Sequence, residues 1–327
     1  MDILYIVVPC YNEEEVLPET SKRLREKMRQ LMDAGTISPD SRVLLVNDGS
    51  KDRTWEMIRA LHKADPLFDG LSLSRNRGHQ NALMAGLMTA RKYADMVISM
   101  DADLQDDIGA VDEMVEKYHE GCDIVYGVRS ARDKDTAFKR GTAQSFYKLI
   151  NAMGGEVVYD HADYRLMSRR ALDALAEYGE VNLFLRGIVP MLGYKTGVVT
   201  YERGERFAGE SKYPLKKMLA FAGEGITSLT TRPLRLILAL GILALFVSAV
   251  LLVVFVVQAI LPHAAENWQL LSGIRALTFL LVFCTGLILT ALGVVGEYVG
   301  KCYMEVKHRP RYHIAEHLHA GSREFDF

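Results

Sequence analysis

The 327-residue sequence lacks the marks of several common protein classes. Its four cysteines are scattered without Cys-x-x-Cys spacing, which argues against a disulfide framework and a zinc site. His79 and His161 have no second His or Cys at a supporting spacing, so we interpret them as loop or packing residues rather than metal ligands. Neither Gly-x-Gly-x-x-Gly nor Gly-x-x-x-x-Gly-Lys-Ser/Thr occurs, which disfavours a nicotinamide enzyme and a P-loop NTPase. With 39 Lys and Arg against 41 Asp and Glu, the formal net charge is -2, which argues against a nucleic-acid-binding protein.

Apolar residues are concentrated after residue 235. The run 236–261 carries no charge over about 26 residues and would reach roughly 39 Å as a helix, enough to cross a hydrocarbon core of about 30 Å. A second uncharged run covers residues 276–296. We therefore predict two transmembrane helices. The preceding segment 211–235 mixes lysines with apolar residues, which indicates an interfacial amphipathic helix or, as the alternative, an ordinary surface helix.

Positive charges flank the two runs unevenly. Arg275 is the one Lys or Arg between them. Others lie shortly before the first run or shortly after the second, namely Lys212, Lys216, Lys217, Arg232, Arg235, Lys301, Lys307, Arg309 and Arg311. Because Lys and Arg accumulate on the cytoplasmic side, this bias predicts a multi-pass protein of the cell (inner) membrane. Residues 1–210 and the tail 297–327 would then both be cytoplasmic, joined by a membrane hairpin.

Residues 1 to about 130 alternate short apolar runs with helical patterns. Strands are predicted at 3–8, 42–47, 71–73, 96–100 and 124–126, and helices at 13–32, 54–62, 80–93 and 111–119. Strands of continuous Val, Ile and Leu between helices indicate an α/β fold with a mostly parallel sheet covered on both faces. Ligands of such sheets bind at the carboxyl ends of the strands, and that is where this sequence has its polar clusters.

The strongest polar cluster is MDADLQDD, directly after the fourth strand. Asp101 and Asp103 alternate with Ala102, so both carboxylates can meet one cation, and Gln105 offers a further neutral oxygen. Hard divalent cations prefer oxygen ligands and also bind water and substrate phosphates. By itself such a triplet is weak evidence, because acidic loops are common and are usually just solvated.

Three further strand ends carry polar clusters. They are Pro9, Tyr11, Asn12 and Glu13 after the first strand, Asp48, Gly49 and Ser50 after the second, and Arg75, Gly78 and Asn81 after the third. Carboxylates, amides and an aromatic ring suit a nucleobase and a ribose, while arginine and a helix N-terminus suit a diphosphate. Each cluster alone could merely turn the chain and cap a helix. Four clusters at successive strand ends, with Asp101 and Ala102 in the last, favour a nucleotide site.

The motifs VVPCYNEEE, VNDGSKDRT, RNRGHQNAL and MDADLQDD resemble those of the family 2 glycosyltransferases, which have a GT-A fold. The segments HADYRLMSRRAL, RGERFAGESKYPLKKM and GEYVGKCYMEVKHRPRY resemble the polyprenyl-phosphate glycosyltransferases, such as dolichyl-phosphate mannose synthase and the bactoprenol glucosyltransferases. The resemblance covers nearly the whole chain. A processive polysaccharide synthase of the same superfamily would carry Gln-x-x-Arg-Trp, and neither Trp55 nor Trp268 stands in that context.

The resemblance implies an inverting, metal-dependent transfer of a sugar to polyprenyl (undecaprenyl) phosphate, for modification of a cell-envelope glycan. UDP-glucose is the expected donor, with UDP-N-acetylglucosamine, a modified UDP-arabinose and GDP-mannose as alternatives. Mg²⁺ or Mn²⁺ held by Asp101, Asp103 and Gln105 would neutralise the leaving diphosphate. A transferase acting on a protein or glycan hydroxyl and a catalytically silent nucleotide-sugar-binding membrane regulator are the competing hypotheses. Homo-oligomers also occur in the family.

The resemblance further assigns residues to the acceptor and to catalysis. Arg129, Arg140 and Arg206 match positions that the family uses around the acceptor phosphate, and Lys212 is a weaker candidate of the same kind. Asp163 matches the aspartate often assigned as the catalytic base and joins Asp103 as an expected catalytic residue. A phosphate monoester has a second pKa around 6 and needs little help from a base. We therefore expect Asp163 to orient the acceptor or a sugar hydroxyl at least as much as to accept a proton.

Overall fold

The structure is a computed structural model, and it describes residues 1–129, 161–181, 184–202 and 266–320, together with scattered helical positions between 234 and 253. Some of the predictions above fall outside this part of the chain. They concern Arg140, Arg206, Lys212, nearly all of the predicted interfacial segment 211–235 and most of the predicted span 236–261.

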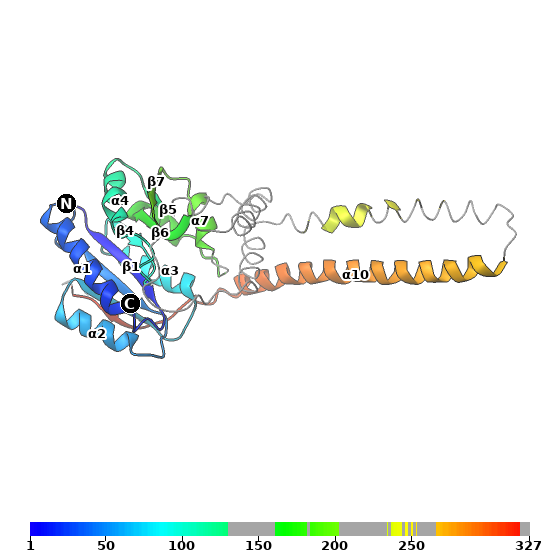
Figure 1. Ribbon diagram of the computed structural model, residues 1–327, viewed down its shortest axis with the longest axis horizontal. Helices are drawn as coiled ribbons and strands as arrows, with labels where there is room; N and C mark the ends of the chain where they lie inside the picture. Colours follow the sequence, from blue (N-terminus) through cyan, green and yellow to red (C-terminus); the bar gives the residue numbers. More distant parts are fainter. Residues whose placement is uncertain are drawn as a thin grey trace.

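One mixed sheet of eight strands forms the centre of the N-terminal part (Figure 1). In chain order the strands are β1 (Leu4–Cys10), β2 (Arg42–Asn47), β3 (Phe68–Leu73), β4 (Met96–Ser99), β5 (Ile124–Arg129), β6 (His161–Ser168), β7 (Thr196–Tyr201) and β8 (Ile314–Leu318). Their order across the sheet is β7-β5-β6-β4-β1-β2-β3-β8, and β6 and β8 run antiparallel to their neighbours. The other strands run in one direction. The predicted α/β fold is thus confirmed.

Helices cover both faces of this sheet. They are α1 (Leu17–Asp33), α2 (Thr54–Ala64), α3 (His79–Ala90), α4 (Ala110–His119), α6 (Arg169–Ala176) and α7 (Leu185–Met191). Leu4, Ile6 and Val8 of β1 share a core with residues of α1, α2 and α4. Tyr5 and Val7 share the opposite core with residues of α3, α6 and α7. Because successive strand residues point to opposite faces, a strand buried on both sides is apolar along its whole length.

A helix of 41 residues, α10 (Glu266–Val306), projects away from the sheet domain (Figure 1). Among the described residues, the segment Phe283–Val306 is the one helical stretch long and apolar enough to cross a membrane. Several of its apolar side chains are exposed, Leu289 and Val299 among them. This segment overlaps the second predicted span, 276–296, while the first predicted span lies largely outside the described residues.

The chain returns to the sheet after α10. There β8 pairs antiparallel with β3 and extends the sheet at that edge. Trp55 Nε1 of α2 donates to Glu316 of β8 at 3.3 Å, and Arg59 forms an ion pair with the same carboxylate. The segment 297–327, predicted as a C-terminal tail, therefore contains the end of α10 and a strand of the sheet.

Candidate active site

The carboxyl ends of β1 to β4 meet at one edge of the sheet, as their parallel pairing requires. At the end of β1, Asn12 has a positive φ of 53°. Its backbone N–H donates to Ser50 Oγ at 3.0 Å, and its Oδ1 accepts the N–H of Lys51 at 2.9 Å. Tyr11 beside it is exposed, while Pro9 is buried inside β1. The structure thus brings Asn12 and Ser50, from two predicted clusters, into contact.

Asp48, just after β2, holds the loop that precedes α3. Its Oδ1 accepts the N–H of Arg77 at 2.7 Å, and its Oδ2 accepts the N–H of Gly78 at 2.9 Å. Burial raises the pKa of this carboxyl, and the two N–H groups oppose the rise by stabilising its charged form. Both oxygens therefore fix the backbone of the predicted diphosphate-binding loop, in which Gly78 has a φ of 84°.

The backbone at Gly49 lies close to the same loop, and we predict that Gly49→Ala destabilises the protein. Its φ is 63°, and a Cβ would lie 2.5 Å from the carbonyl carbon of Arg75 and 2.5 Å from the nitrogen of Asn76. Left-handed strain together with this overlap should lower the free energy of unfolding by about 2–4 kcal/mol, measured by thermal unfolding in detergent.

The matched control for that prediction is Gly193→Ala. Gly193 has a similar φ of 68°, but no described atom lies within 4 Å of its Cβ position. It should therefore lose only about 1–2 kcal/mol, from the left-handed strain alone. Equal losses in the two variants would contradict the close approach of Gly49 to the loop.

The remaining predicted residues near this loop differ in their surroundings. Glu13 donates its backbone N–H to Thr54 Oγ1 at 2.9 Å, which ties the end of β1 to α2, and Arg75 is exposed. Asn81 Nδ2 donates to the carbonyl oxygen of Arg77 at 2.9 Å. Asn81 Oδ1 and Arg77 Nε are buried and have no hydrogen-bond partner among the described residues. Since buried polar atoms are normally paired, these two atoms mark a place where a polar ligand can bind.

Asp101 and Asp103 follow β4 on a short loop, residues 100–109, which we call the aspartate loop. Thr20 Oγ1 of α1 donates to the carbonyl oxygen of Ala102 at 2.8 Å and anchors the loop. Asp103 Oδ1 accepts the N–H of Gln105 at 3.2 Å. The contact with α1 thus anchors the loop, and Asp103, one of the predicted metal ligands, stabilises its local fold.

Negative charge is crowded around Asp101. Burial raises the pKa of Asp101 to about 6, and although His79 opposes the rise, neighbouring carboxylates add to it. One of these neighbours is Asp106, whose Oδ2 is buried without a hydrogen-bond partner among the described residues. Such a set of carboxylate oxygens fits a divalent cation. No three His, Cys, Asp or Glu side chains of the described residues form a metal-binding group by themselves, so further oxygens would come from a diphosphate and from water.

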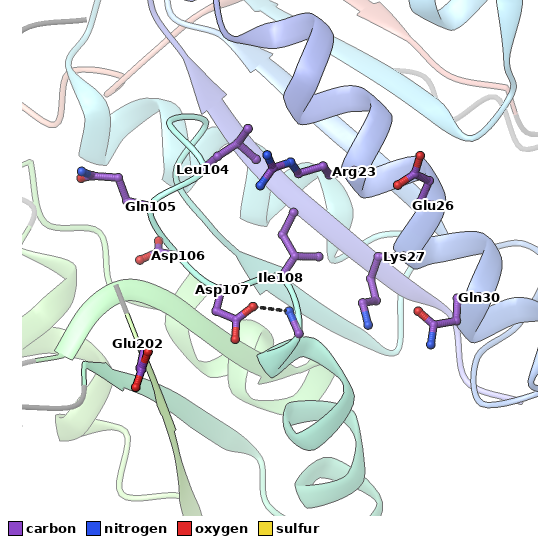
Figure 2. A pocket seen from close by; sticks show the side chains of 11 residues that line it. Arg23, Glu26, Lys27, Gln30, Leu104, Gln105, Asp106, Asp107, Ile108 and Glu202 are labelled. Atoms are coloured by element: carbon purple, nitrogen blue, oxygen red, sulfur yellow. Dashed lines mark hydrogen bonds between the residues drawn. The ribbon is translucent and has the colours of Figure 1, made fainter. Parts of the chain in front are cut away.

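A cavity of about 580 Å³ lies beside the aspartate loop (Figure 2). It is bounded by α1 on one side and by residues 104–109 on the other. Arg23 and Lys27 of α1 line it together with Asp107 and with Glu202, which follows β7. Figure 2 shows the Gln105 side chain pointing away from α1. The cavity therefore leaves space for a polar ligand next to the loop that carries the predicted metal site.

Asp163, in β6, is buried and surrounded by cations. Arg165 Nη2 lies 2.6 Å from its Oδ1, and Arg186 Nη2 lies 3.2 Å from its Oδ2. His79 Nε2 lies 3.5 Å from the same Oδ2. Burial by itself would raise the pKa of Asp163, but the three cations hold that pKa well below its usual value. Asp163 is therefore an ionised carboxylate in a fixed position, which makes it a weak proton acceptor at neutral pH.

His79 links this network to the aspartate loop. Its Nε2 lies 3.7 Å from Asp101 Oδ1 as well as 3.5 Å from Asp163. Desolvation by the surrounding protein would lower the pKa of His79, whose side chain is still 40% exposed, but the two carboxylates raise it to about 9. His79, interpreted from the sequence as a loop or packing residue rather than a metal ligand, thus also lies between two carboxylates of the site. Sequence reasoning also missed Arg186, whose partner Asp163 lies on another element. It missed Arg165 as well, although Arg165 stands two residues from Asp163 in β6 and therefore on the same face of the sheet.

Arg129, the last residue of β5, contacts a buried acid. Its Nη2 lies 3.5 Å from Asp106 Oδ1, and its Nε donates to the hydroxyl of Tyr201 at 3.3 Å. That hydroxyl in turn donates to Asp106 Oδ1. The predicted acceptor residue Arg129 thus lies beside the aspartate loop and shares a network with two residues that the sequence did not single out.

The class of the protein follows from comparison with a known family. The chain matches the family Glycosyl transferase family 2 over residues 5–176, which include β1 from Tyr5 onward, the strands β2 to β6, and Asp163. The chain belongs to this family and is a glycosyltransferase of the hexosyltransferase type.

Individual relatives cover nearly the whole chain. The uncharacterized glycosyltransferase YkoT of Bacillus subtilis (strain 168) is 50% identical over 95% of this chain and 91% of its own length. The prophage bactoprenol glucosyl transferase homolog of Escherichia coli (strain K12) is 38% identical over 94% of this chain and 97% of its own length. The bactoprenol glucosyl transferase of Shigella phage SfII is 38% identical over 97% of this chain and 98% of its own length.

Proposed function

We propose that the protein transfers a sugar from a nucleotide sugar, with UDP-glucose as the first candidate, to polyprenyl (undecaprenyl) phosphate with inversion at the anomeric carbon. The reaction would take place at the cytoplasmic face of the cell membrane and supply a lipid-linked sugar for cell-envelope glycan modification. One observation carries the proposal: the cations around Asp163 contact the aspartate loop at Asp101 through His79. A reaction between two phosphate-bearing substrates needs cations of this kind between them. The relatives named bactoprenol glucosyl transferases support the same acceptor.

The donor would bind along the strand ends. Asp101, Asp103 and Gln105 would hold Mg²⁺ or Mn²⁺, which when bound neutralises charge on the leaving diphosphate. The loop held by Asp48 would present the start of α3 to the diphosphate. The buried, unpartnered Asn81 Oδ1 at the start of that helix supports a polar ligand there.

The acceptor phosphate would act as the nucleophile without a general base. The second pKa of a phosphate monoester is around 6, so the attacking oxygen is largely ionised at neutral pH. Asp163 is held in its charged form by Arg165 and Arg186. Its task in this reaction would be to orient the cations that receive the acceptor phosphate.

We also propose that α10 and the segment 236–261 form a hairpin through the membrane. Because β8 ties the chain to the sheet directly after α10, the Val306 end of α10 is on the side of the sheet domain. The 41 residues of α10 reach roughly 60 Å, so Glu266 would lie beyond the bilayer. A chain that leaves the sheet domain after Glu202 and enters α10 at that far end has to cross the membrane once more. The lysines and arginines after residue 300 support a cytoplasmic sheet domain.

A panel of labelled nucleotide sugars tests the proposal, with membranes that contain the protein and added undecaprenyl phosphate. We expect UDP-glucose to give a labelled, solvent-extractable lipid that disappears with EDTA and returns with added Mg²⁺ or Mn²⁺. Product from UDP-N-acetylglucosamine, a modified UDP-arabinose or GDP-mannose instead would change the donor and keep the acceptor. Binding of nucleotide sugar without lipid-linked product from any donor would overturn the proposed transfer and favour a silent regulator.

A further inference from the structure

The last turns of α10 have two different sides. Leu292, Val299, Tyr303 and Val306 are exposed, and their spacing of three, four or seven residues places them along one side of the helix. Each residue turns an α-helix by about 100°, so Glu305, two positions after Tyr303, lies on the opposite side. The row of exposed apolar side chains thus follows the side of α10 that Glu305 does not occupy.

The Glu305 side of α10 contacts the sheet domain. The N–H of Val181 donates to both carboxylate oxygens of Glu305, at 3.0 and 2.8 Å. Shortly after the end of α10, Arg311 donates to the carbonyl oxygen of Tyr178. These contacts fix one side of α10 against the segment that leads into α7, so the row of exposed apolar residues that includes Tyr303 is turned away from that segment.

Two cations stand at the end of this exposed row. Lys307 Nζ lies 4.0 Å from the centre of the Tyr303 ring, which places Lys307 on the exposed side, and an ammonium over an aromatic face keeps its charge. Lys307 and Arg309 are both exposed, and neither forms an ion pair with a carboxylate of the described residues. The nearest acid in the sequence, Glu305, is bound to Val181, and the partial negative charge of a helix C-terminus amounts to only about half a unit. The end of α10 therefore presents positive charge that the described part of the chain does not neutralise.

The position of these cations along α10 fits the polar boundary of a bilayer. The apolar stretch Phe283–Val306 ends directly before Lys307. Its 24 residues reach about 36 Å as a helix, slightly more than a hydrocarbon core of about 30 Å. Tyr303 would then lie at the edge of the core and Lys307 among the lipid headgroups. Tyrosine and lysine are favoured there, because each combines an apolar stem with a polar end.

We propose that Tyr303, Lys307 and Arg309 form a binding surface for the headgroups of anionic phospholipids in the leaflet next to the sheet domain. Two cations without a carboxylate partner favour a headgroup of net negative charge over a zwitterionic one, whose own ammonium cancels the charge of its phosphate. The lipid acceptor is not the expected ligand, because this surface lies on the side of α10 opposite to the contact with the segment before α7. The inference rests on the proposed membrane crossing of α10 and not on the proposed sugar transfer.

The double variant Lys307→Gln with Arg309→Gln tests this surface in the full-length protein in a nonionic detergent. Native mass spectrometry measures the binding of dioleoylphosphatidylglycerol, which is anionic, and of dioleoylphosphatidylcholine, which is zwitterionic. We expect the wild type to bind the anionic lipid more tightly, and the double variant to bind it roughly 5- to 30-fold more weakly with no change for the zwitterionic lipid. The matched control, Lys22→Gln with Lys63→Gln, removes the same charge from exposed positions of α1 and α2, away from α10 (Figure 1). It should bind both lipids as the wild type does.

Several results would overturn the proposal. Equal binding of the two lipids by the wild type would show no preference for net negative charge. A double variant that keeps phosphatidylglycerol but loses undecaprenyl phosphate would assign the surface to the lipid acceptor, and an equal loss in the control pair would show a general effect of charge.

A second variant guards against a misfolded helix end. Lys307→Arg with Arg309→Lys keeps both charges and should bind phosphatidylglycerol within about threefold of the wild type. A loss as large as that of the glutamine variant would contradict a surface that acts through charge. Binding of phosphatidylglycerol by a protein that makes no lipid-linked product would refute the proposed sugar transfer and still support this surface.

Discussion

Asp103→Ala is expected to reduce sugar transfer at least about 100-fold while the fold and membrane insertion stay intact. Asp103 lies on a loop that is anchored to α1 through Thr20 and Ala102, and its Oδ1 accepts the N–H of Gln105 within that loop. Because Asp103 belongs to neither hydrophobic core, we expect its removal to leave the sheet and both cores unchanged. The variant loses one of the two carboxylates that would hold the cation against the diphosphate, which is where charge develops in the reaction.

The rate of formation of lipid-linked product measures this effect. Asp173→Ala is the control, because Asp173 is 59% exposed on α6 and pairs with Arg91 away from the aspartate loop. It should retain a rate close to that of the wild type. Undiminished transfer by Asp103→Ala, or an equal loss in both variants, would remove Asp103 from the metal site.

The second large effect is expected from Asp163→Asn, on stability as well as on activity. The neutral amide leaves the buried guanidinium of Arg165 without its charged partner, and breaking a buried ion pair from one side costs about 3–5 kcal/mol. Thermal or urea unfolding in detergent measures the loss. Asp173→Asn is the control, since Asp173 also pairs with an arginine but is 59% exposed, and such a pair contributes about 0–1 kcal/mol. Similar losses in the two variants would mean that the Asp163 network does not stabilise the fold.

The stabilisation by Asp163 has a defined pH window. Its pKa in the folded protein lies well below the ordinary value of 3.8. A carboxyl whose pKa is lowered by folding stabilises the folded state above its unfolded pKa, and this contribution is lost as the pH falls through the folded pKa. The difference in stability between wild type and Asp163→Asn should therefore be largest between about pH 4 and pH 6 and narrow below about pH 4. It should also narrow as the pH rises from about 6.5 towards 9, because Asp163 helps to raise the pKa of His79 to about 9 and that stabilisation is lost as His79 loses its proton. Narrowing already as the pH falls from about 7 to about 5 would contradict a paired, ionised Asp163.

Local patterns predicted the central elements closely. The predicted strand 42–47 coincides with β2, because a strand buried on both faces is a continuous apolar run with clear ends. The predicted strand 71–73 is too short, since β3 begins at Phe68. Asp69 and Gly70 interrupt its apolar run, and the polar group of Asp69 is satisfied by His319 and Ala320 from the far end of the chain. A local sequence pattern cannot reveal a partner that lies so far along the chain.

The same distinction applies to the candidate site, where some features could be predicted from the sequence and others could not. The strand-end clusters were predictable, because parallel strands bring their carboxyl ends to one edge. The contacts among them were not, because they depend on tertiary packing. Asp48 uses both oxygens on backbone N–H groups, which leave no signature in a sequence. His79 meets Asp163 from another strand, and Arg186 reaches the same carboxylate from α7.

The strand β8 gives the protein an order of assembly. Asp69 in β3 contacts His319, which lies 250 residues later in the chain. During synthesis, the edge of β3 that pairs with β8 is therefore made long before β8 exists. An uncovered edge of this kind is a template for wrong pairing between nascent chains. Because α10 precedes β8, the sheet can be completed only after that helix has been synthesised. Biogenesis of the catalytic domain is thereby coupled to that of the long helix, and a chain truncated before β8 keeps an open, aggregation-prone edge.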